Sequence, residues 1–511
     1  MPAKRPRPQQ KSSPPVHAVV SKPSPPPSAI AQRFGALGRS PLGFVLATVL
    51  LLLPCFWGAY IQAGDLSSHI YNSWLAQLVQ TGKVSGLTLA SQSTNILFDL
   101  ILSGLFRSLG AATAQRIAVS LAVLVFVWGA FALASAASGR RAWAVLPCIA
   151  MLAYGWVFHM GFFDFYLSLG LCFCGLAAAW DPTPKRVAIA APFFLLAFLA
   201  HALAFAWGAG LLAYLIAAKY VGDERRLQLT AVGVIAILAG RIAVGSLWRT
   251  RWTAAQIQLI TGADQLQVFA AKYTLFFIAL LLLWVILFVS LIRSQTKSAL
   301  LSGLPLQLCI LSAAAVFLLP GRIDIPGYRH GLVYIAERMS LTVGICLCAL
   351  LASAKIGQAQ RWSMAILAAV FFLMLFRDES ALNAFEQQIG RAVASLPYGQ
   401  RVLLGLDDDS LTRVNAITHM IDRECIGRCY SYANYEPSTW QFRVRAIAPN
   451  PYVASEYRDS ILMQGGQYLV KPADLPLYQV SIDNSGRVGL LSLAPRRING
   501  MRFCKVLPDA L

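Results

Sequence analysis

Long uncharged apolar segments constrain this chain more than any other feature of its sequence. Residues 273–292 and 300–319 contain no charged side chain, and each segment is long enough to cross the roughly 30 Å hydrocarbon core of a bilayer as a helix. Only 13% of all residues are charged, against about 25% in ordinary soluble domains. This composition excludes a water-soluble enzyme and predicts an α-helical polytopic membrane protein.

Eleven apolar segments are expected to form membrane helices. They are 42–62, 113–137, 144–158, 162–180, 187–201, 203–218, 227–245, 269–292, 299–319, 334–354 and 362–377. To reach this count, the long apolar runs 144–180 and 187–218 must each fold into two short helices. Alternate loops carry at least two basic residues each, and such loops stay in the cytoplasm. The protein is therefore expected in the plasma (inner) membrane, with its N-terminus inside and its C-terminal region outside.

The charge distribution divides the chain into three parts. Residues 1–40 hold seven basic residues and no acid, and their many prolines predict a disordered, basic cytoplasmic tail. Residues 41–377 form the expected transmembrane domain. Residues 378–511 hold 14 acidic and 14 basic residues, enough for one small extracytoplasmic α/β domain. The excess positive charge lies in the tail and the membrane loops, so a nucleic-acid partner is not expected.

Ionisable residues gather on the expected outer side of the membrane. Because such groups are costly near hydrocarbon unless they face a cavity or a partner, this gathering predicts a site, although solvated loop ends would explain many of them. The acidic residues are Asp65, Asp99, Asp164, Asp264, Asp324 and Glu337, and the histidines are His69, His159, His201 and His330.

The first outer loop, residues 63–112, opens with an acidic residue and continues with two amphipathic segments. Asp65 and His69 are four residues apart and so share one face of a helix. The segments 69–80 and 95–109 have the pattern of helices that lie in the membrane interface. The loop is expected to carry an acidic site at the membrane surface.

These features resemble the GT-C class of membrane glycosyltransferases, which use polyprenyl-phosphate sugars. The pattern Asp65-x-x-x-His69-x-Tyr71-x-x-Trp74 followed by Gly82 is similar to that of bacterial members, and so is the segment 159–166. The acidic pair found in some subfamilies is absent, because Leu66 follows Asp65. The resemblance implies a GT-C-like fold and three kinds of partner: a polyprenyl-phosphate sugar donor, membrane lipid, and a saccharide, lipid or protein acceptor.

Such a transfer requires a base for the acceptor hydroxyl and a group that holds the departing phosphate. Asp65 is the candidate base, and its alternative role is that of a helix N-cap. His69 is a candidate to orient Asp65 or to bind the acceptor. His159 and Asp164 are further candidate substrate-binding residues within the resembling segment.

Basic residues near the outer ends of later segments are the candidates for the phosphate. Arg338 is favoured because Arg binds phosphate through two parallel hydrogen bonds, and its alternative is an ion pair with Glu337. Arg329 and His330 lie in the preceding outer loop. Lys272 is expected either to assist or only to extend its ammonium toward water. No metal-ligand motif or organic cofactor is predicted, and a divalent metal requirement is left open.

The C-terminal region has the patterns of a mixed α/β domain. The expected elements are a strand at 401–406, a helix at 411–421, a strand at 440–446 and a hairpin of strands 478–482 and 488–493. Three cysteines lie here, in an expected oxidising compartment. A bridge between Cys425 and Cys429 is slightly favoured over one that uses Cys504.

The sequence thus predicts a glycosyltransferase acting on the outer face of the membrane. Two alternatives from other classes stay open, a transporter or flippase of lipid-linked saccharides and a non-catalytic protein of envelope assembly. A transporter would place polar residues across the middle of the bilayer, where only Arg241 is expected.

Overall fold

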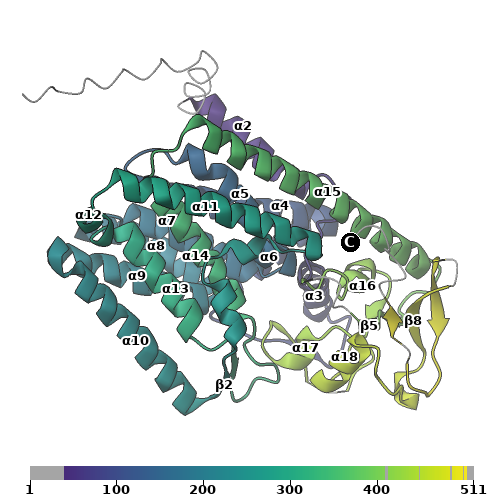
Figure 1. Cartoon of the computed structure of the whole chain (residues 1–511). Coiled ribbons are helices and arrows are strands. Elements are labelled where there is room, and N and C mark those ends of the chain that lie inside the picture. The colour runs from purple at the N-terminus through teal and green to yellow at the C-terminus, as the bar shows by residue number, and fades with distance from the viewer. Residues whose placement is uncertain (1–39, 409–412, 448, 484–485, 499, 503–511) are drawn as a thin grey trace, which may run out of the picture. The chain divides into compact units, whose positions relative to one another are not determined.

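The computed structural model describes residues 40–502, with the exception of 409–412, 448, 484–485 and 499. Residues 49–511 form one compact unit, and the contacts given below lie within it. Helices make up most of this unit (Figure 1). Up to Ala394 they are α2 (Pro41–Leu52), α3 (Leu66–Gln80), α4 (Leu97–Ser138), α5 (Leu146–Ala153), α6 (Trp156–Met160), α7 (Phe163–Ala178), α8 (Pro184–Ala200), α9 (Ala202–Tyr220), α10 (Arg226–Leu247), α11 (Thr274–Ser294), α12 (Lys297–Leu301), α13 (Leu304–Leu318), α14 (Ile335–Leu351) and α15 (Gln358–Ala394).

Six helical segments in the described part of the chain are long and apolar enough to cross a membrane. They are Leu97–Ser138, Trp143–Met160, Ala202–Tyr220, Asp223–Leu247, Ala271–Ser294 and Gln358–Ala394. All eleven expected segments overlap a helix. The helices outside these six are shorter or less apolar, so a count of eleven crossings stays a prediction. The first expected segment, 42–62, is longer than its helix, because α2 ends at Leu52.

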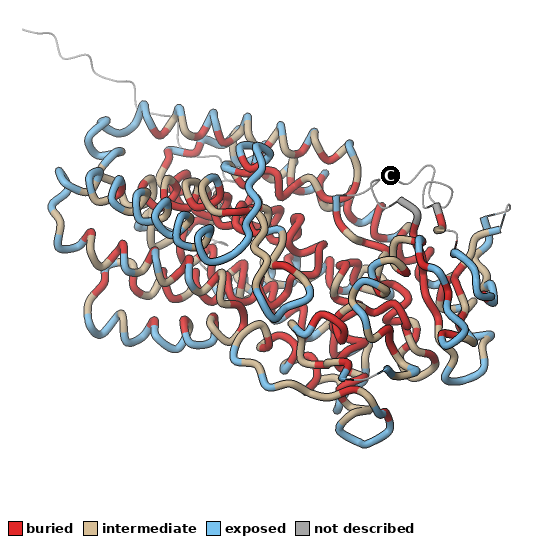
Figure 2. Tube along the Cα trace, turned by 90° about the horizontal axis from the view of Figure 1, so that it is seen from below, coloured by how far each residue is buried: buried red, intermediate tan, exposed pale blue. Residues whose placement is uncertain are grey.

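Exposed apolar faces are consistent with a helical membrane protein. Helix α10 buries only Thr230, and its exposed residues include Ile235 and Ile242, which are 64% and 65% accessible. Leu275 on α11 and Leu373 on α15 are similarly exposed. Figure 2 shows these outer faces in pale blue around a buried interior. Apolar faces of this extent are unfavourable in water and favourable in contact with lipid chains.

The second long apolar run folds into two helices, as predicted. The first folds into three, of which α5 and α6 together form one candidate membrane span, Trp143–Met160. In the first run the chain turns between α6 and α7 at Gly161, which has a φ of 84°. In the second, α8 and α9 meet at His201, whose extended backbone interrupts the helix. Helix α7 packs closely against α4, where a Cβ on Gly129 would lie 2.5 Å from the carbonyl oxygen of Gly170. This packing fixes the turn at Gly161 within the core.

Both segments of residues 63–112 that were expected to be helical lie in helices. The first lies in α3. The second is the beginning of α4, which kinks at Gly110, a residue with non-helical φ and ψ of 75° and 171°. The segment 95–109 and the following apolar segment are therefore joined in one kinked helix.

Helix α15 runs through the position where a separate C-terminal domain was expected to begin. It continues beyond Asp378 to Ala394 and buries Asp378, Glu379 and Glu386. The change in composition at 378 thus occurs inside a helix. The acidic residues that follow it face the helical core instead of water.

The C-terminal region is a small mixed α/β structure. Its sheet has the strand order β6-β4-β8-β9, in which β8 and β9 form the predicted antiparallel hairpin. The bounds are β4 (Arg401–Leu403), β5 (Leu406–Asp408), β6 (Tyr430–Ser431), β7 (Val444–Ala446), β8 (Leu477–Ile482), β9 (Val488–Ser492), β10 (Met501–Arg502), α16 (Met420–Glu424), α17 (Glu436–Thr439) and α18 (Tyr457–Gln464).

Two predicted elements of this region are largely wrong. The expected helix 411–421 overlaps only the start of α16, and the expected strand 440–446 is reduced to β7. Strand β7 pairs with β1 (Leu87–Leu89) of the first outer loop, a long-range partner that local periodicity does not reveal. The C-terminal region is in this way joined directly to the first outer loop.

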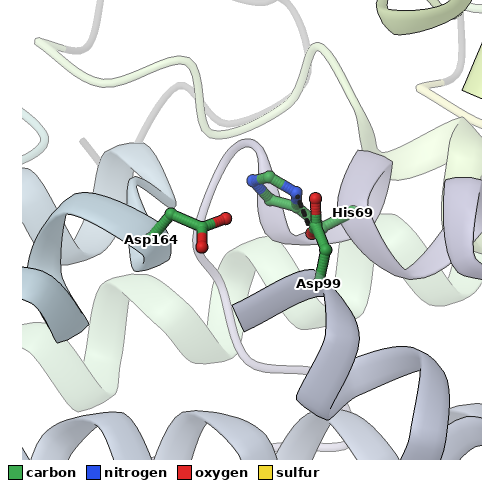
Figure 3. A group of neighbouring side chains, drawn as sticks. All are labelled: His69, Asp99 and Asp164. Atoms are coloured by element: carbon green, nitrogen blue, oxygen red, sulfur yellow. Dashed lines mark ion pairs between the residues drawn. The ribbon is translucent and has the colours of Figure 1, made fainter. Parts of the chain in front are cut away.

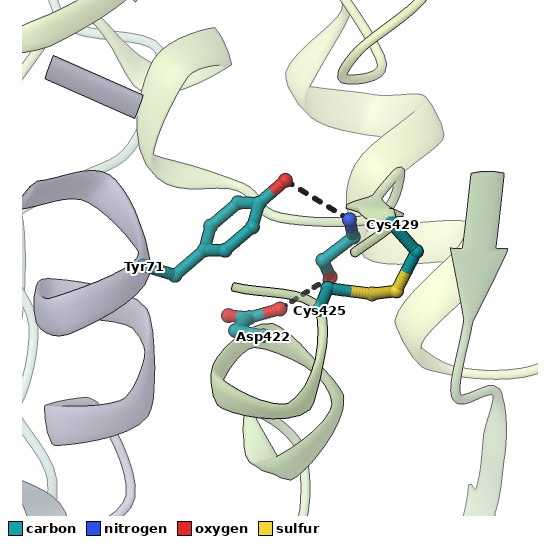
Figure 4. Close-up of a disulfide and its surroundings, with 5 residues drawn as sticks. Tyr71, Asp422, Cys425 and Cys429 are labelled. Carbon is teal, nitrogen blue, oxygen red and sulfur yellow. Dashed lines mark hydrogen bonds between the residues drawn. A yellow bond between two sulfur atoms is a disulfide. The ribbon is translucent and has the colours of Figure 1, made fainter. Parts of the chain in front are cut away.

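The favoured disulfide is confirmed. Cys425 and Cys429 are bridged, and Figure 4 shows the bridge beside Tyr71 of α3 and Asp422 of α16. The backbone N–H of Ser431 donates a 3.0 Å hydrogen bond to the Tyr71 hydroxyl. Cys504 lies outside the described residues.

Candidate functional site

Asp65 lies immediately before α3, in a turn that packs against the α6–α7 turn. Its backbone N–H donates to the carbonyl oxygen of Met160 at 3.0 Å, and the N–H of Gly64 donates to that of His159 at 2.8 Å. A Cβ on Gly161 would lie 2.5 Å from the Asp65 nitrogen, so only glycine fits there. Asp65 occupies the N-cap position of α3, but its carboxylate makes no capping hydrogen bond to the helix.

The carboxylate of Asp65 instead faces a histidine of the C-terminal region. Its Oδ1 lies 3.7 Å from Nε2 of His419, while Nδ1 of the same ring lies 2.9 Å from Oδ2 of Asp422. Burial disfavours the imidazolium, but the hydrogen bond and charge of Asp422, together with the charge of Asp65, raise the pKa of His419 above 6.5. His419 is thus held between two carboxylates.

Arg338 lies at the start of α14, near Asp65. The centre of its guanidinium lies 3.8 Å from the ring centroid of Phe162, and Nη1 lies 3.4 Å from Nε2 of His201. Among the described residues no carboxylate forms an ion pair with Arg338, and its buried Nε has no hydrogen-bond partner. The alternative role of Arg338, an ion pair with Glu337 or another acid, is therefore not seen among the described residues. Asp65 is the acid whose charge acts most strongly on this guanidinium.

Aromatic and polar residues complete this side of the site. The Tyr435 ring lies between those of His419 and His330, with centroid distances of 5.3 and 6.1 Å. Burial and the positive charge of Arg338 lower the pKa of His330. His330 is thus favoured in its neutral form close to a fixed cation.

A second group of ionisable residues lies beyond Asp65 along α3. His69 Nδ1 and Asp99 Oδ1 are 2.8 Å apart, and Asp164 stands beside this pair (Figure 3). Burial disfavours a charged His69, but the charge and hydrogen bond of Asp99, together with the charges of Glu436 and Asp164, outweigh it and keep the pKa of His69 well above 6.5. His69 therefore pairs with Asp99 and not, as the sequence suggested, with Asp65.

Glu436 joins the two groups. The Ser68 hydroxyl donates a 2.6 Å hydrogen bond to its Oε1. Burial raises the pKa of Glu436 to about 7, against the opposing charge of His69 and the hydrogen bond from Ser68. This carboxyl group can therefore change its protonation near neutral pH inside the site.

Three predicted substrate-binding residues have structural partners elsewhere. Nε2 of His159 lies 3.0 Å from Glu379, and Lys272 pairs with Asp378 at 2.7 Å. Arg329 lies 3.3 Å from Glu456. The first two pairs hold α15 against the helical core. The third joins the segment 320–333 to the C-terminal region.

The structure adds His419, Asp422, Tyr435 and Glu436 to the candidate site. All come from the C-terminal region, and no local pattern distinguishes them from residues of a soluble domain. Asp99 belonged to the outer acidic residues of the sequence, but only its approach to His69 reveals its partner.

Comparison of the chain with known protein families, with curated proteins and with solved structures finds no match.

Proposed function

We propose that this protein is a membrane glycosyltransferase that moves a sugar from a polyprenyl-phosphate donor to an acceptor hydroxyl on the outer face of the membrane. The observation that carries the proposal is the position of Arg338. Its guanidinium has no carboxylate partner among the described residues and lies near the Asp65–His419 pair. A half-buried guanidinium with free donors is suited to a phosphate.

The proposed reaction needs one base and one anion-binding group. Asp65 accepts the proton of the acceptor hydroxyl as the oxygen of that hydroxyl attacks the anomeric carbon of the donor. The bond from that carbon to the phosphate oxygen breaks, and Arg338 stabilises the negative charge of the departing polyprenyl phosphate. His419 holds the Asp65 carboxylate in place, and Asp422 holds His419. Tyr435 offers an aromatic face beside this pair for a sugar ring.

A transfer assay with the full chain in detergent or liposomes tests the proposal. The substrates are labelled polyprenyl-phosphate sugars, scored for hydrolysis and for transfer to added saccharide acceptors. Asp65→Asn is expected to reduce turnover by about 10² or more. Asp181→Asn is the matched control, because Asp181 lies in an exposed ion pair with Arg186 and Lys219.

Equal turnover by the wild type and the Asp65→Asn variant would contradict the role of Asp65. Movement of the intact lipid-linked sugar across liposomes without any transfer would contradict the enzyme and favour the flippase alternative.

A further inference from the structure

His69, Asp99 and Asp164 come together from three separate elements. They lie on α3, in the first turn of α4 and in the first turn of α7, and one ligand atom from each lies within 4.8 Å of the others. Figure 3 shows the imidazole of His69 between the two carboxylates. All three residues are buried, with 7%, 9% and 4% of their surfaces accessible.

Three buried atoms of this group have no hydrogen-bond partner among the described residues: His69 Nδ1, Asp99 Oδ1 and Asp164 Oδ2. The first two lie 2.8 Å apart as an ion pair. Asp164 Oδ1 accepts a 2.9 Å hydrogen bond from the backbone N–H of Phe98, which holds the carboxylate in place. Its Oδ2 is buried without a donor among the described residues. A buried carboxylate oxygen without a donor is costly. An electropositive ligand would remove this cost.

The charges of the group point to a cation. Within the described part of the chain, no Lys or Arg forms an ion pair with Asp99 or Asp164. Two carboxylates therefore share one imidazole in a buried site. One imidazole nitrogen and two carboxylate oxygens are ligands that Zn²⁺ and Mn²⁺ accept in proteins.

We propose that His69, Asp99 and Asp164 bind a divalent transition-metal ion, with Zn²⁺ preferred. Metal–ligand bonds of about 2.0 to 2.2 Å place neighbouring ligand atoms roughly 3.4 Å apart around a tetrahedral ion. The His69–Asp99 separation of 2.8 Å is shorter than this value, and all three ligand atoms lie within 4.8 Å of one another, so small side-chain movements would reach it. The fourth position is open to water or another ligand.

This metal site is independent of the proposed sugar transfer, because it uses neither Asp65 nor Arg338. Its structural effect is clear from the elements that it joins. A bound ion would tie the interfacial helix α3 to α4 and α7, which form the packed core below the site.

Metal binding by the purified full-length protein, without an affinity tag, tests the proposal. After treatment with a chelator, Zn²⁺ and Mn²⁺ are titrated separately by calorimetry, and the bound metal is counted by mass spectrometry. The expected result is one equivalent of Zn²⁺ per chain and a higher melting temperature in its presence. Binding of neither ion by the wild type would overturn the proposal.

Asp164→Asn is the informative variant, because the amide oxygen can still accept the hydrogen bond from Phe98. We expect at least a 10-fold loss of Zn²⁺ affinity. Asp474→Asn is the control, since Asp474 is a buried carboxylate that accepts hydrogen bonds from Tyr432 and Tyr468. Should Asp164→Asn fail to fold, Asp99→Asn takes its place. Equal affinity in the wild type and the ligand variants would show binding elsewhere and refute the site.

Discussion

The Asp65 carboxylate lies 3.7 Å from Nε2 of His419, although the two residues come from the first outer loop and the C-terminal region. The base candidate of the helical domain is thus completed by a residue from the other end of the chain. Around this pair the β1–β7 pairing and the Ser68–Glu436 hydrogen bond join the same two regions. The C-terminal region is therefore part of the candidate site.

The charge of His419 should determine the alkaline limit of the proposed activity. Since Asp422 raises the pKa of His419, the His419 ring stays positively charged up to a pH above 6.5. In this form it stabilises the anionic form of Asp65. As the pH rises through this raised pKa, His419 loses its proton and the rate should fall. Asp422→Asn removes the stabilising charge, so the fall should occur about one pH unit lower or more.

Rates of sugar transfer between pH 5.5 and 9 provide the measurement. Asp459→Asn is the control, because Asp459 pairs with Lys471 within the C-terminal region. If the rate falls at the same alkaline pH in the wild type and in the Asp422→Asn variant, this role of Asp422 is excluded.

Arg338 should act through the geometry of its guanidinium and not through its charge alone. Arg338→Lys keeps the charge but cannot form two parallel hydrogen bonds with a phosphate, so the Kd for polyprenyl phosphate should rise about 10-fold. Arg329→Lys should leave the Kd unchanged, since Arg329 pairs with Glu456. Normal affinity of the Arg338→Lys variant would rule out the phosphate role.

The helical part of the fold could be predicted from the sequence because membrane helices have a strong local signal. Apolar length located the helices, and the breaks at Gly161 and His201 lie where the sequence analysis placed turns. The outer acidic and histidine residues indicated the region of the site. Tertiary pairing has no such signal, so the position of His419 beside Asp65 was missed.

The structural partners of His159 and Lys272 were missed for one common reason. These partners, Glu379 and Asp378, follow the change in composition at residue 378 and were expected in a separate soluble domain. Because α15 continues to Ala394, these acids are buried against the core. A composition boundary does not have to coincide with the end of a helix.

Stability should depend on pH through Glu424 of α16. Burial and the charge of Glu386 raise the pKa of Glu424 to about 7, against a hydrogen bond with Tyr60 and the charge of Arg423. The folded protein therefore holds this proton more tightly than the unfolded chain, whose glutamate has its usual pKa of about 4.3. The stabilisation is present at low pH and is lost as the pH rises toward and through 7.

Glu424→Gln removes this titration and should flatten the pH dependence of unfolding. Relative to the wild type, the variant should gain about 1 to 3 kcal/mol between pH 5 and pH 8. Thermal melts at the two pH values measure the change, with Glu456→Gln as the control, since the Glu456 side chain is 68% exposed. An equal fall in Tm for the wild type and Glu424→Gln would exclude Glu424 as the cause.

The last prediction concerns Gly161, which allows the α6–α7 turn to approach Asp65. Alanine there would suffer both a left-handed φ of 84° and a Cβ placed 2.5 Å from the Asp65 nitrogen. The first effect costs about 1 to 2 kcal/mol for a residue with a side chain, and the second displaces the backbone that carries the candidate base. Gly161→Ala should therefore lower Tm and also reduce the rate of the proposed transfer.

Gly82 offers a matched control, because its φ is 66° but no atom lies within 4 Å of an added Cβ. Gly82→Ala should lower Tm by the backbone cost alone and leave the rate unchanged. If both variants lose the same stability and neither loses activity, the close approach of Gly161 does not position Asp65.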